Sequence, residues 1–151
     1  MPDYIGPPRD AAEREAALRL RWQVLRQPLG QPRGSEIDAH EARAVLLVAV
    51  AAAGRVLGTA RLHALDGAQG QIRYMAVAEP CRGRGIGRRL LAALEDAARA
   101  RGLRTLRLNA RETVAGFYRR HGYRVIGTGP LLLGRIPHLR MEKHLNEEDT
   151  P

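Results

Sequence analysis

Cysteine is almost absent from this sequence of 151 residues, since Cys81 is its single example. An internal disulfide is therefore impossible, and a zinc site built from several thiolates is excluded. Long apolar runs are lacking as well. The longest, AVLLVAVAAA at 44–53, is much shorter than the roughly 18 residues that cross a bilayer. No charged segment followed by an apolar stretch stands at Met1, so we expect a cytoplasmic protein without a membrane partner.

Lysine and aromatic residues are also scarce. Lys143 is the sole lysine among 25 basic residues, which outnumber the 16 acidic ones and give a formal charge of +9. Such a charge attracts polyanions, which include nucleic acids and phosphorylated cofactors. The arginines are spread along the chain and the few aromatic residues form no stacking pattern, so we expect no nucleic-acid partner.

Helical and strand-like segments alternate along the chain, which predicts a mixed α/β fold with residues 1–151 in a single domain. Asp10 and Glu13 form a capping-box pattern that begins a first helix over about 10–26. Strands are expected at 44–53, 55–65, 71–77, 103–110, 123–127 and 136–145, and further helices at 88–101 and about 113–120. The polar segment 31–43 is long enough to be a lid, and 146–151 is expected to be a frayed acidic tail.

The segment PCRGRGIGRRLL at 80–91 is the main candidate for a functional site. It joins a strand to a helix, where exposed N–H groups and the helix dipole favour an anion. Glycines at 83, 85 and 87 allow successive N–H groups to converge on phosphate oxygens. A P-loop is excluded because Gly87 is followed by Arg88 rather than Lys. A dinucleotide fingerprint is excluded because Arg88 and Leu90 stand where glycine or alanine is required.

The pattern Arg82-x-x-Gly85-x-Gly87 fits the signature Q/R-x-x-G-x-G/A. Together with YMAVAEPCRGRGIGRRLL at 74–91 and LNARETVAGFYRRHGYRVIG at 108–127, it resembles the GNAT superfamily of N-acetyltransferases over roughly residues 18–145. The resemblance implies a central mixed, largely antiparallel sheet that splays between the family's fourth and fifth strands, which match 71–77 and 103–109 here. It also implies that an amine, on a small molecule or a protein, attacks acetyl-CoA directly in a ternary complex. The enzyme could act as a homodimer.

The resemblance further implies which residues hold coenzyme A. The N–H groups of the loop would bind its pyrophosphate; the residues concerned are Arg82, which marks the motif, Gly83, Arg84, Gly85, Ile86, Gly87 and Arg88. Either Arg88 or Arg89 would face an outer phosphate. Met75 and Val77 would present main-chain groups to the pantetheine arm, and a main-chain N–H near Val77 would polarise the thioester carbonyl. Many family members have an asparagine that contacts the pantetheine arm, but Arg111 stands at that position here. Asn109 would supply the contact instead.

Tyr118 matches the tyrosine that serves as general acid in many members of the family. The general base is less clear, because Gln71 stands where the histone acetyltransferases carry a glutamate. His138 is the favoured catalytic base, ahead of His63, Asp38, His40 and Glu41. Cys81 is interpreted as a packing residue rather than a nucleophile.

Two other functions stay open, and so does the acceptor. Gln71 also suits an acyl-CoA sensor that has lost its base, and the net charge suits a nucleic-acid-binding protein, which has less support. The resemblance implies that segments 26–43 and 127–138 determine which acceptor is used. Neither segment contains a sequence signature that identifies the acceptor. Small amines, amino-sugar antibiotics, polyamines and protein N-termini are all compatible, and the acidic residues of the predicted lid favour a cationic acceptor.

Overall fold

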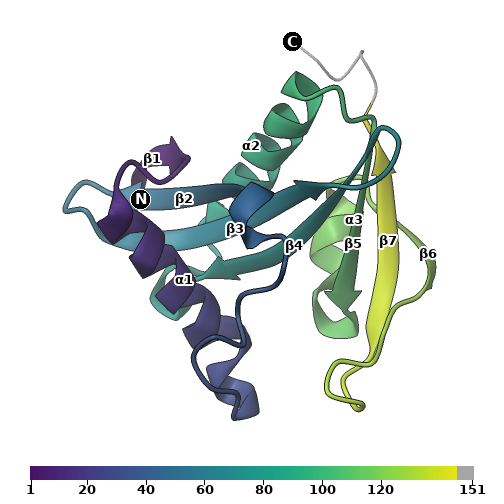
Figure 1. Cartoon of the computed structure of the whole chain (residues 1–151), viewed down its shortest axis with the longest axis horizontal. Helices are drawn as coiled ribbons and strands as arrows, with labels where there is room; N and C mark the ends of the chain where they lie inside the picture. Colours follow the sequence, from purple (N-terminus) through teal and green to yellow (C-terminus); the bar gives the residue numbers. More distant parts are fainter. Residues whose placement is uncertain (146–151) are drawn as a thin grey trace.

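The computed structural model describes residues 1–145, so the predicted acidic tail at 146–151 lies outside the described residues. Its strands form one sheet in the order β1-β2-β3-β4-β5-β7-β6 (Figure 1). The elements are β1 (Pro2–Gly6), α1 (Ala11–Leu25), β2 (Val45–Ala51), β3 (Val56–Ala64), β4 (Gln69–Val77), α2 (Ile86–Ala100), β5 (Thr105–Arg111), α3 (Ala115–Arg120), β6 (Arg124–Thr128) and β7 (His138–His144). Short 3₁₀ turns lie at η1 (Gln27–Leu29), η2 (Glu41–Arg43), η3 (Glu79–Cys81) and η4 (Glu112–Val114).

The sheet is antiparallel at every strand pair except β4 and β5, which run parallel. These two strands pair only between Gln69–Gln71 and Thr105–Arg107, and beyond that point they diverge. Figure 1 shows the gap that opens between their carboxyl ends. The expected mixed sheet, splayed at this place, is confirmed.

β1 was not predicted from the sequence. It is a five-residue edge strand that pairs antiparallel with β2, with Tyr4 opposite Val50. Prolines at positions 2, 7 and 8 make this segment read as a turn in the sequence, because a proline has no N–H to donate a hydrogen bond to a neighbouring strand. The backbone groups along the outer edge of an edge strand have no neighbouring strand to pair with. Pro2, which lacks an N–H, is therefore tolerated there.

The helix ends follow their local sequence signals. At the start of α1, the N–H of Glu13 donates to Asp10 Oδ1 at 2.8 Å, as the capping pattern predicts. The Glu13 carboxylate accepts from the N–H of Arg9 rather than that of Asp10. At the C-terminal end of α2, Gly102 has φ +74° and ends the helix.

Helices cover both faces of the sheet, with α1 on one and α2 and α3 on the other (Figure 1). The larger core lies beneath α2 and α3 and includes Leu62, Leu90, Leu94, Leu106 and Met141. The smaller one lies beneath α1 and includes Ala17, Leu20, Val48 and Val50. Within residues 1–145, no helix combines the length and the apolar character that crossing a bilayer requires.

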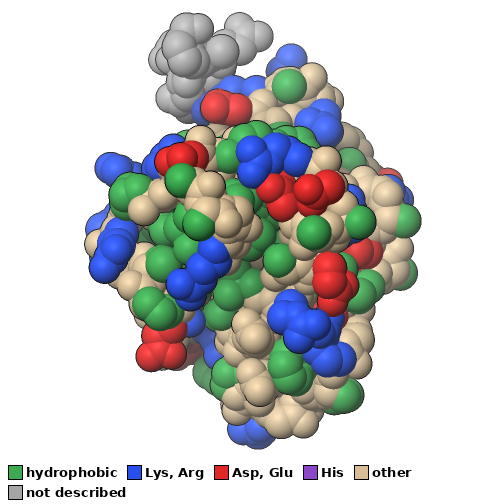
Figure 2. All heavy atoms as spheres, turned by 90° about the vertical axis from the view of Figure 1, so that its left-hand side faces the viewer, with side chains coloured by type: hydrophobic (Ala, Val, Ile, Leu, Met, Phe, Trp, Pro, Cys, Tyr) green, Lys and Arg blue, Asp and Glu red, His purple; other side chains and the backbone are tan. Residues whose placement is uncertain are grey.

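Basic side chains are distributed rather than gathered on the face shown in Figure 2, which looks from the side of β1 and the β2–β3 turn. Lysine and arginine side chains on this face are separated by acidic and apolar ones. The formal charge of +9 is therefore not concentrated in one patch here.

Candidate active site

A cavity of about 1290 Å³ lies where β4 and β5 diverge. It is lined by the candidate residues Met75, Val77, Arg82, Gly83, Gly85, Ile86, Gly87, Arg88, Asn109, Tyr118 and His138. Arg84 is exposed and is absent from the described lining. The fold thus brings together candidates that are more than sixty positions apart in the sequence.

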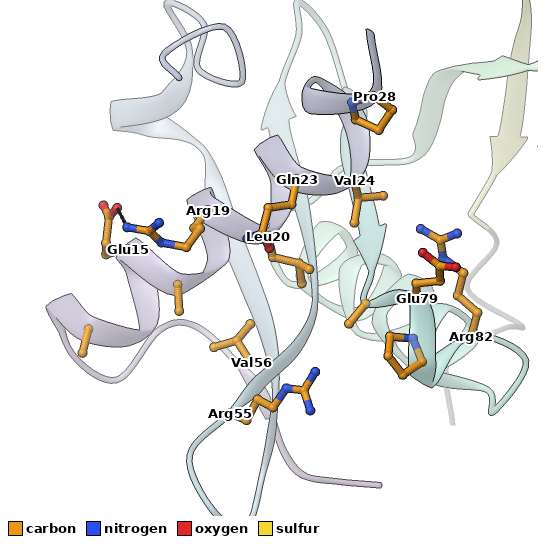
Figure 3. A pocket seen from close by; sticks show the side chains of 14 residues that line it. Glu15, Arg19, Leu20, Gln23, Val24, Pro28, Arg55, Val56, Glu79 and Arg82 are labelled. Carbon is orange, nitrogen blue, oxygen red and sulfur yellow. Dashed lines mark ion pairs between the residues drawn. The ribbon is translucent and has the colours of Figure 1, made fainter. Parts of the chain in front are cut away.

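A second, smaller hollow of about 720 Å³ lies beside α1 (Figure 3). Its floor is apolar, with Leu20 and Val56 among the lining residues, and Glu15 and Arg19 form an ion pair at its edge. Arg82 is the one predicted site residue among its described lining. The candidate chemistry therefore belongs to the larger cavity.

A bulge in β4 decides which side chains face which side of the sheet. Ala60 of β3 opposes both Tyr74 and Met75, and Tyr74 has φ +66°, a conformation that is strained for a residue with a side chain. The extra residue interrupts the alternation of faces. Arg73 and Tyr74 consequently both lie on the side of α1, whereas Met75 packs against the core beneath α2.

The N–H of Val77 points into the gap between β4 and β5. The next N–H along the strand, that of Ala78, donates to the Leu57 carbonyl at 2.8 Å, and Val77 lies opposite Gly58. Bonded and non-bonded pairs alternate in an antiparallel ladder, so the polar groups of Val77 point away from β3. Arg82 Nε accordingly donates to the Val77 carbonyl at 3.2 Å, which ties the loop at 82–88 to β4.

The loop before α2 presents a row of free N–H groups. The first helical bond runs from the N–H of Arg89 to the Gly85 carbonyl at 3.1 Å. Among the described residues, no protein acceptor binds the N–H groups of 83–88. Gly83 and Gly85 have φ +79° and +82°, so glycine is what lets the backbone turn in this way. These groups and the N-terminus of α2 fit the pyrophosphate of coenzyme A.

The two arginines that follow the loop point in different directions. Arg88 lines the cavity, whereas Arg89 Nη1 lies 3.5 Å from the carbonyl oxygen of Pro2, on the side of β1. Of the pair, Arg88 is therefore the one positioned for a phosphate. A Cβ at Gly87 would lie 3.5 Å from Phe117 and 3.8 Å from Met75 Sδ, so loop, α3 and β4 converge at this point.

Tyr118 is buried in α3, with its ring at an edge-to-face angle to Phe117 and Tyr123. Burial raises the pKa of its hydroxyl to about 12. The phenol therefore keeps its proton at neutral pH, as a proton donor must.

Hydrogen bonds fix different tautomers on two of the histidines that line the cavity, His138 and His63. His138 Nδ1 lies 3.0 Å from the Ile136 carbonyl, which can only accept, so neutral His138 has a free lone pair on Nε2. Arg61 Nη2 lies 3.3 Å from His63 Nδ1, and a guanidinium can only donate. His63 consequently carries its proton on Nε2. Burial, followed by the nearby His40 and Arg61, lowers the pKa of His63 to about 4.

The acidic residues of the predicted lid are engaged in ion pairs. Hydrogen bonds from Arg61, at 2.7 and 2.8 Å, hold the pKa of Asp38 well below its usual range. Burial alone would raise the pKa of Glu41, but Arg21 and Arg61 outweigh it and lower that pKa. Both carboxylates are therefore weak bases, and their charge is already balanced by arginines.

The sequence did not single out Arg26, Arg73 and Tyr74, which are among the residues of the cavity wall. Their positions depend on the bulge in β4 and on the end of α1, which no local pattern indicates. Four guanidinium groups, those of Arg21, Arg26, Arg61 and Arg73, lie over the Tyr74 ring at 4.5 to 5.5 Å from its centroid.

Comparisons with known proteins agree with this geometry. The model of the acetyltransferase (GNAT) family matches residues 12–123. The uncharacterized N-acetyltransferase YjcF of Bacillus subtilis is 33% identical over 127 residues, which cover 84% of this chain and 89% of YjcF.

Solved structures share the fold. A candidate N-acetyltransferase from Lactobacillus plantarum aligns with a TM-score of 0.81 and 27% identity, over 95% of this chain and 97% of its own. An aminoglycoside 6′-N-acetyltransferase crystallised with coenzyme A aligns with a TM-score of 0.78 and 19% identity, over 93% and 96% of the two chains. The chain therefore belongs to the GNAT family of acetyltransferases, and it is an acyltransferase that uses acetyl-CoA as its cosubstrate.

Proposed function

We propose that the protein transfers the acetyl group of acetyl-CoA to an amine by direct attack within a ternary complex. One observation carries this proposal. The cavity between β4 and β5 has an anion cradle at the loop 83–88, and its wall also holds a protonated buried tyrosine and a histidine with a free Nε2.

Main-chain groups would hold the cosubstrate. The free N–H groups of 83–88 bind the pyrophosphate and Arg88 binds an outer phosphate. Met75 and Val77 face the pantetheine arm from β4, and Asn109 faces it from β5. Asn109 and His138 are neighbours, since a Cβ on Gly129 would lie 3.0 Å from Asn109 Oδ1 and 3.2 Å from His138 Cβ.

The chemistry requires a neutral amine, a stabilised oxyanion and a protonated thiol. The guanidinium groups of the wall disfavour an ammonium ion, which lowers the pKa of the acceptor. His138 Nε2 takes the proton that the amine loses as the C–N bond forms. The N–H of Val77 stabilises the oxyanion, and Tyr118 gives its proton to sulfur as the C–S bond breaks. Gln71 also lines the cavity but plays no part as a base.

The test is acetyl-CoA titration by calorimetry followed by free-thiol release with a panel of amines. We expect binding, and thiol release that depends on an amine. No binding at millimolar acetyl-CoA would overturn the proposed cradle. Binding without release for any amine would instead support an acyl-CoA sensor, the alternative that Gln71 suggests.

Three further expectations belong with this proposal. We take residues 1–151 as one domain, because a single sheet contains strands from Pro2–Gly6 to His138–His144. A homodimer and a cytoplasmic location stay predictions. Analytical ultracentrifugation tests the first, and fractionation of the source cells tests the second.

A further inference from the structure

We propose that the acceptor is an amine with a carboxylate a few bonds from its nitrogen, as in an α-amino acid, and that Arg26 and Arg73 bind this carboxylate. The inference rests on the proposed acetyl transfer and names the substrate class of the same cavity. It follows from the charges of the wall, from one buried arginine and from the hydrogen-bond donors around Tyr74.

The charged residues that line the cavity are all basic. Its described lining contains six arginines and no aspartate or glutamate; the arginines are Arg26, Arg73, Arg82, Arg88, Arg111 and Arg120. Arg82 and Arg88 belong to the loop before α2 and its first turn, and Arg120 belongs to α3 beside that loop. The phosphates of coenzyme A account for this group. Arg26, Arg73 and Arg111 lie on other elements and are left to meet the acceptor.

Arg26 is a buried guanidinium without a carboxylate. Its residue is 9% exposed, Nε donates to the Ser35 carbonyl at 3.2 Å and Nη1 donates to the Leu25 carbonyl at 3.1 Å. Within residues 1–145, no acidic side chain lies in ion-pair distance and no protein acceptor binds Nη2. A buried charge without a counterion is unfavourable, so an anion in the cavity would stabilise it.

Arg73 lies over the same ring as Arg26. The two guanidinium carbons are 4.5 and 5.5 Å from the Tyr74 centroid. Arg73 donates to Asp38 Oδ2 at 2.9 Å, but that carboxylate already receives two bonds from Arg61. The Arg73 side chain is 43% exposed, which leaves donors for a ligand. A planar guanidinium fork matches the two oxygens of a carboxylate.

The neighbouring histidine adds a donor rather than an acceptor. His63 carries its proton on Nε2 because Arg61 occupies Nδ1, and its ring stacks on that of His40 at 4.1 Å. This side of the wall therefore offers donors and positive charge together. The acidic lid residues do not counter it, since Asp38 and Glu41 are bound by Arg21, Arg61 and Arg73. The sequence-based preference for a cationic acceptor consequently loses its physical basis.

The experiment compares carboxylates with matched amides. Leucine, methionine and glutamate are each measured beside leucinamide, methioninamide and the glutamate α-amide, by thiol release and by calorimetry on the coenzyme A complex. These amides keep the amine and the side chain but lose the α-carboxylate. We expect at least one amino acid to exceed its amide about tenfold or more in kcat/KM, the worth of a charged hydrogen bond.

Variants identify the residues responsible. Arg73→Gln and Arg26→Gln should each reduce the carboxylate-to-amide ratio about tenfold and leave the Kd of coenzyme A unchanged. Arg101→Gln is the matched control, because Arg101 is exposed and, within residues 1–145, its side chain donates only to the Ala97 carbonyl of its own helix. Should Arg26→Gln unfold, the half-exposed Arg73 carries the test alone.

Two results separate the inference from the proposed function. Equal or better activity and binding with every amide would overturn carboxylate recognition while acetyl transfer stands. Calorimetric binding of an amino acid that Arg73→Gln weakens, without any thiol release, would support carboxylate recognition and contradict the catalytic proposal.

Discussion

His138 Nδ1 donates to the carbonyl oxygen of Ile136 across 3.0 Å, two residues before it in the chain. The bond fixes the ring and leaves Nε2 as the atom that accepts a proton. Arg61 imposes the opposite tautomer on His63. The sequence alone does not distinguish the chemistry of these two histidines. In the structure, neutral His138 can serve as a base, whereas neutral His63 offers a hydrogen-bond donor.

Replacing His138 by alanine should therefore lower kcat about 100-fold, the usual worth of a general base, with little change in the Kd of acetyl-CoA. Added imidazole should restore part of the rate to His138→Ala, because it can occupy the vacated space and accept the proton. Steady-state kinetics with and without imidazole measures both effects.

The control is His144→Ala. His144 lies on the same strand, β7, but its side chain is 57% exposed and is not part of the described cavity lining. Its loss should leave kcat unchanged. Equal rates for the two variants would remove His138 from the role of base.

Tyr118→Phe should lower kcat about 10- to 100-fold and leave both acetyl-CoA affinity and the melting temperature close to wild type. The pKa of Tyr118 near 12 keeps the phenol protonated, and among the described residues its hydroxyl makes no hydrogen bond that the variant would lose. Kinetics, calorimetry and thermal unfolding test the three parts.

Tyr123→Phe provides the opposite case. The Tyr123 hydroxyl donates to Glu95 Oε2 at 2.8 Å, and both residues are buried. Its loss should reduce the free energy of unfolding by about 1–3 kcal/mol and leave kcat unchanged. A Tyr118 variant that lost stability rather than rate would indicate a packing role.

Much of the fold follows from local sequence signals. The cap at Asp10, the stop at Gly102 and the glycines of the loop 83–88 act on the residues beside them, and each was predicted. The mixed, largely antiparallel sheet and its splay came from the resemblance to the GNAT family, and the structure confirms both. The order of the strands in the sheet was not predicted.

The remaining features depend on distant partners. The bulge at Tyr74 exists because of its register with β3, and the tautomer of His63 is set by Arg61. Arg26 and Arg73 became candidates only when the fold placed them at one ring. Local patterns give no information on such pairings, so the cradle could be predicted but the acceptor side could not.

Gly85 and Gly87 should respond differently to alanine, as the signature Q/R-x-x-G-x-G/A suggests. Gly85 has φ +82°, where a Cβ costs about 1–2 kcal/mol, so Gly85→Ala should distort the cradle and weaken coenzyme A binding about tenfold. At Gly87 a Cβ would make ordinary contacts with Phe117 and Met75 at 3.5 and 3.8 Å.

Gly87→Ala is thus the control for the loop, and its Kd for coenzyme A should stay within about twofold of wild type. Calorimetry gives both values. Loss of binding in Gly87→Ala, or none in Gly85→Ala, would contradict the assignment of strain to position 85.

Stability should fall in mild acid because His63 is buried as the neutral form. Its pKa is lowered from 6.5 to about 4, first by burial and then by His40 and Arg61. Between these two pH values, His63 is protonated in the unfolded chain but neutral in the folded chain. The free energy of unfolding therefore decreases as the pH drops from about 6.5 to 4. Asp38 adds a further loss below its ordinary pKa of 3.8, where the carboxylate held by Arg61 becomes protonated in the unfolded chain.

Urea unfolding at pH values from about 7.5 to 4.5 measures this slope, because this range covers most of the interval in which only the unfolded chain takes up the proton. In His63→Gln the decrease should be smaller by about 1–2 kcal/mol, because glutamine does not titrate and can still accept from Arg61. His144→Gln is the matched control, because the His144 side chain is 57% exposed, whereas His63 is buried. Parallel profiles for wild type and His63→Gln would show that His63 is not the group whose protonation couples to folding.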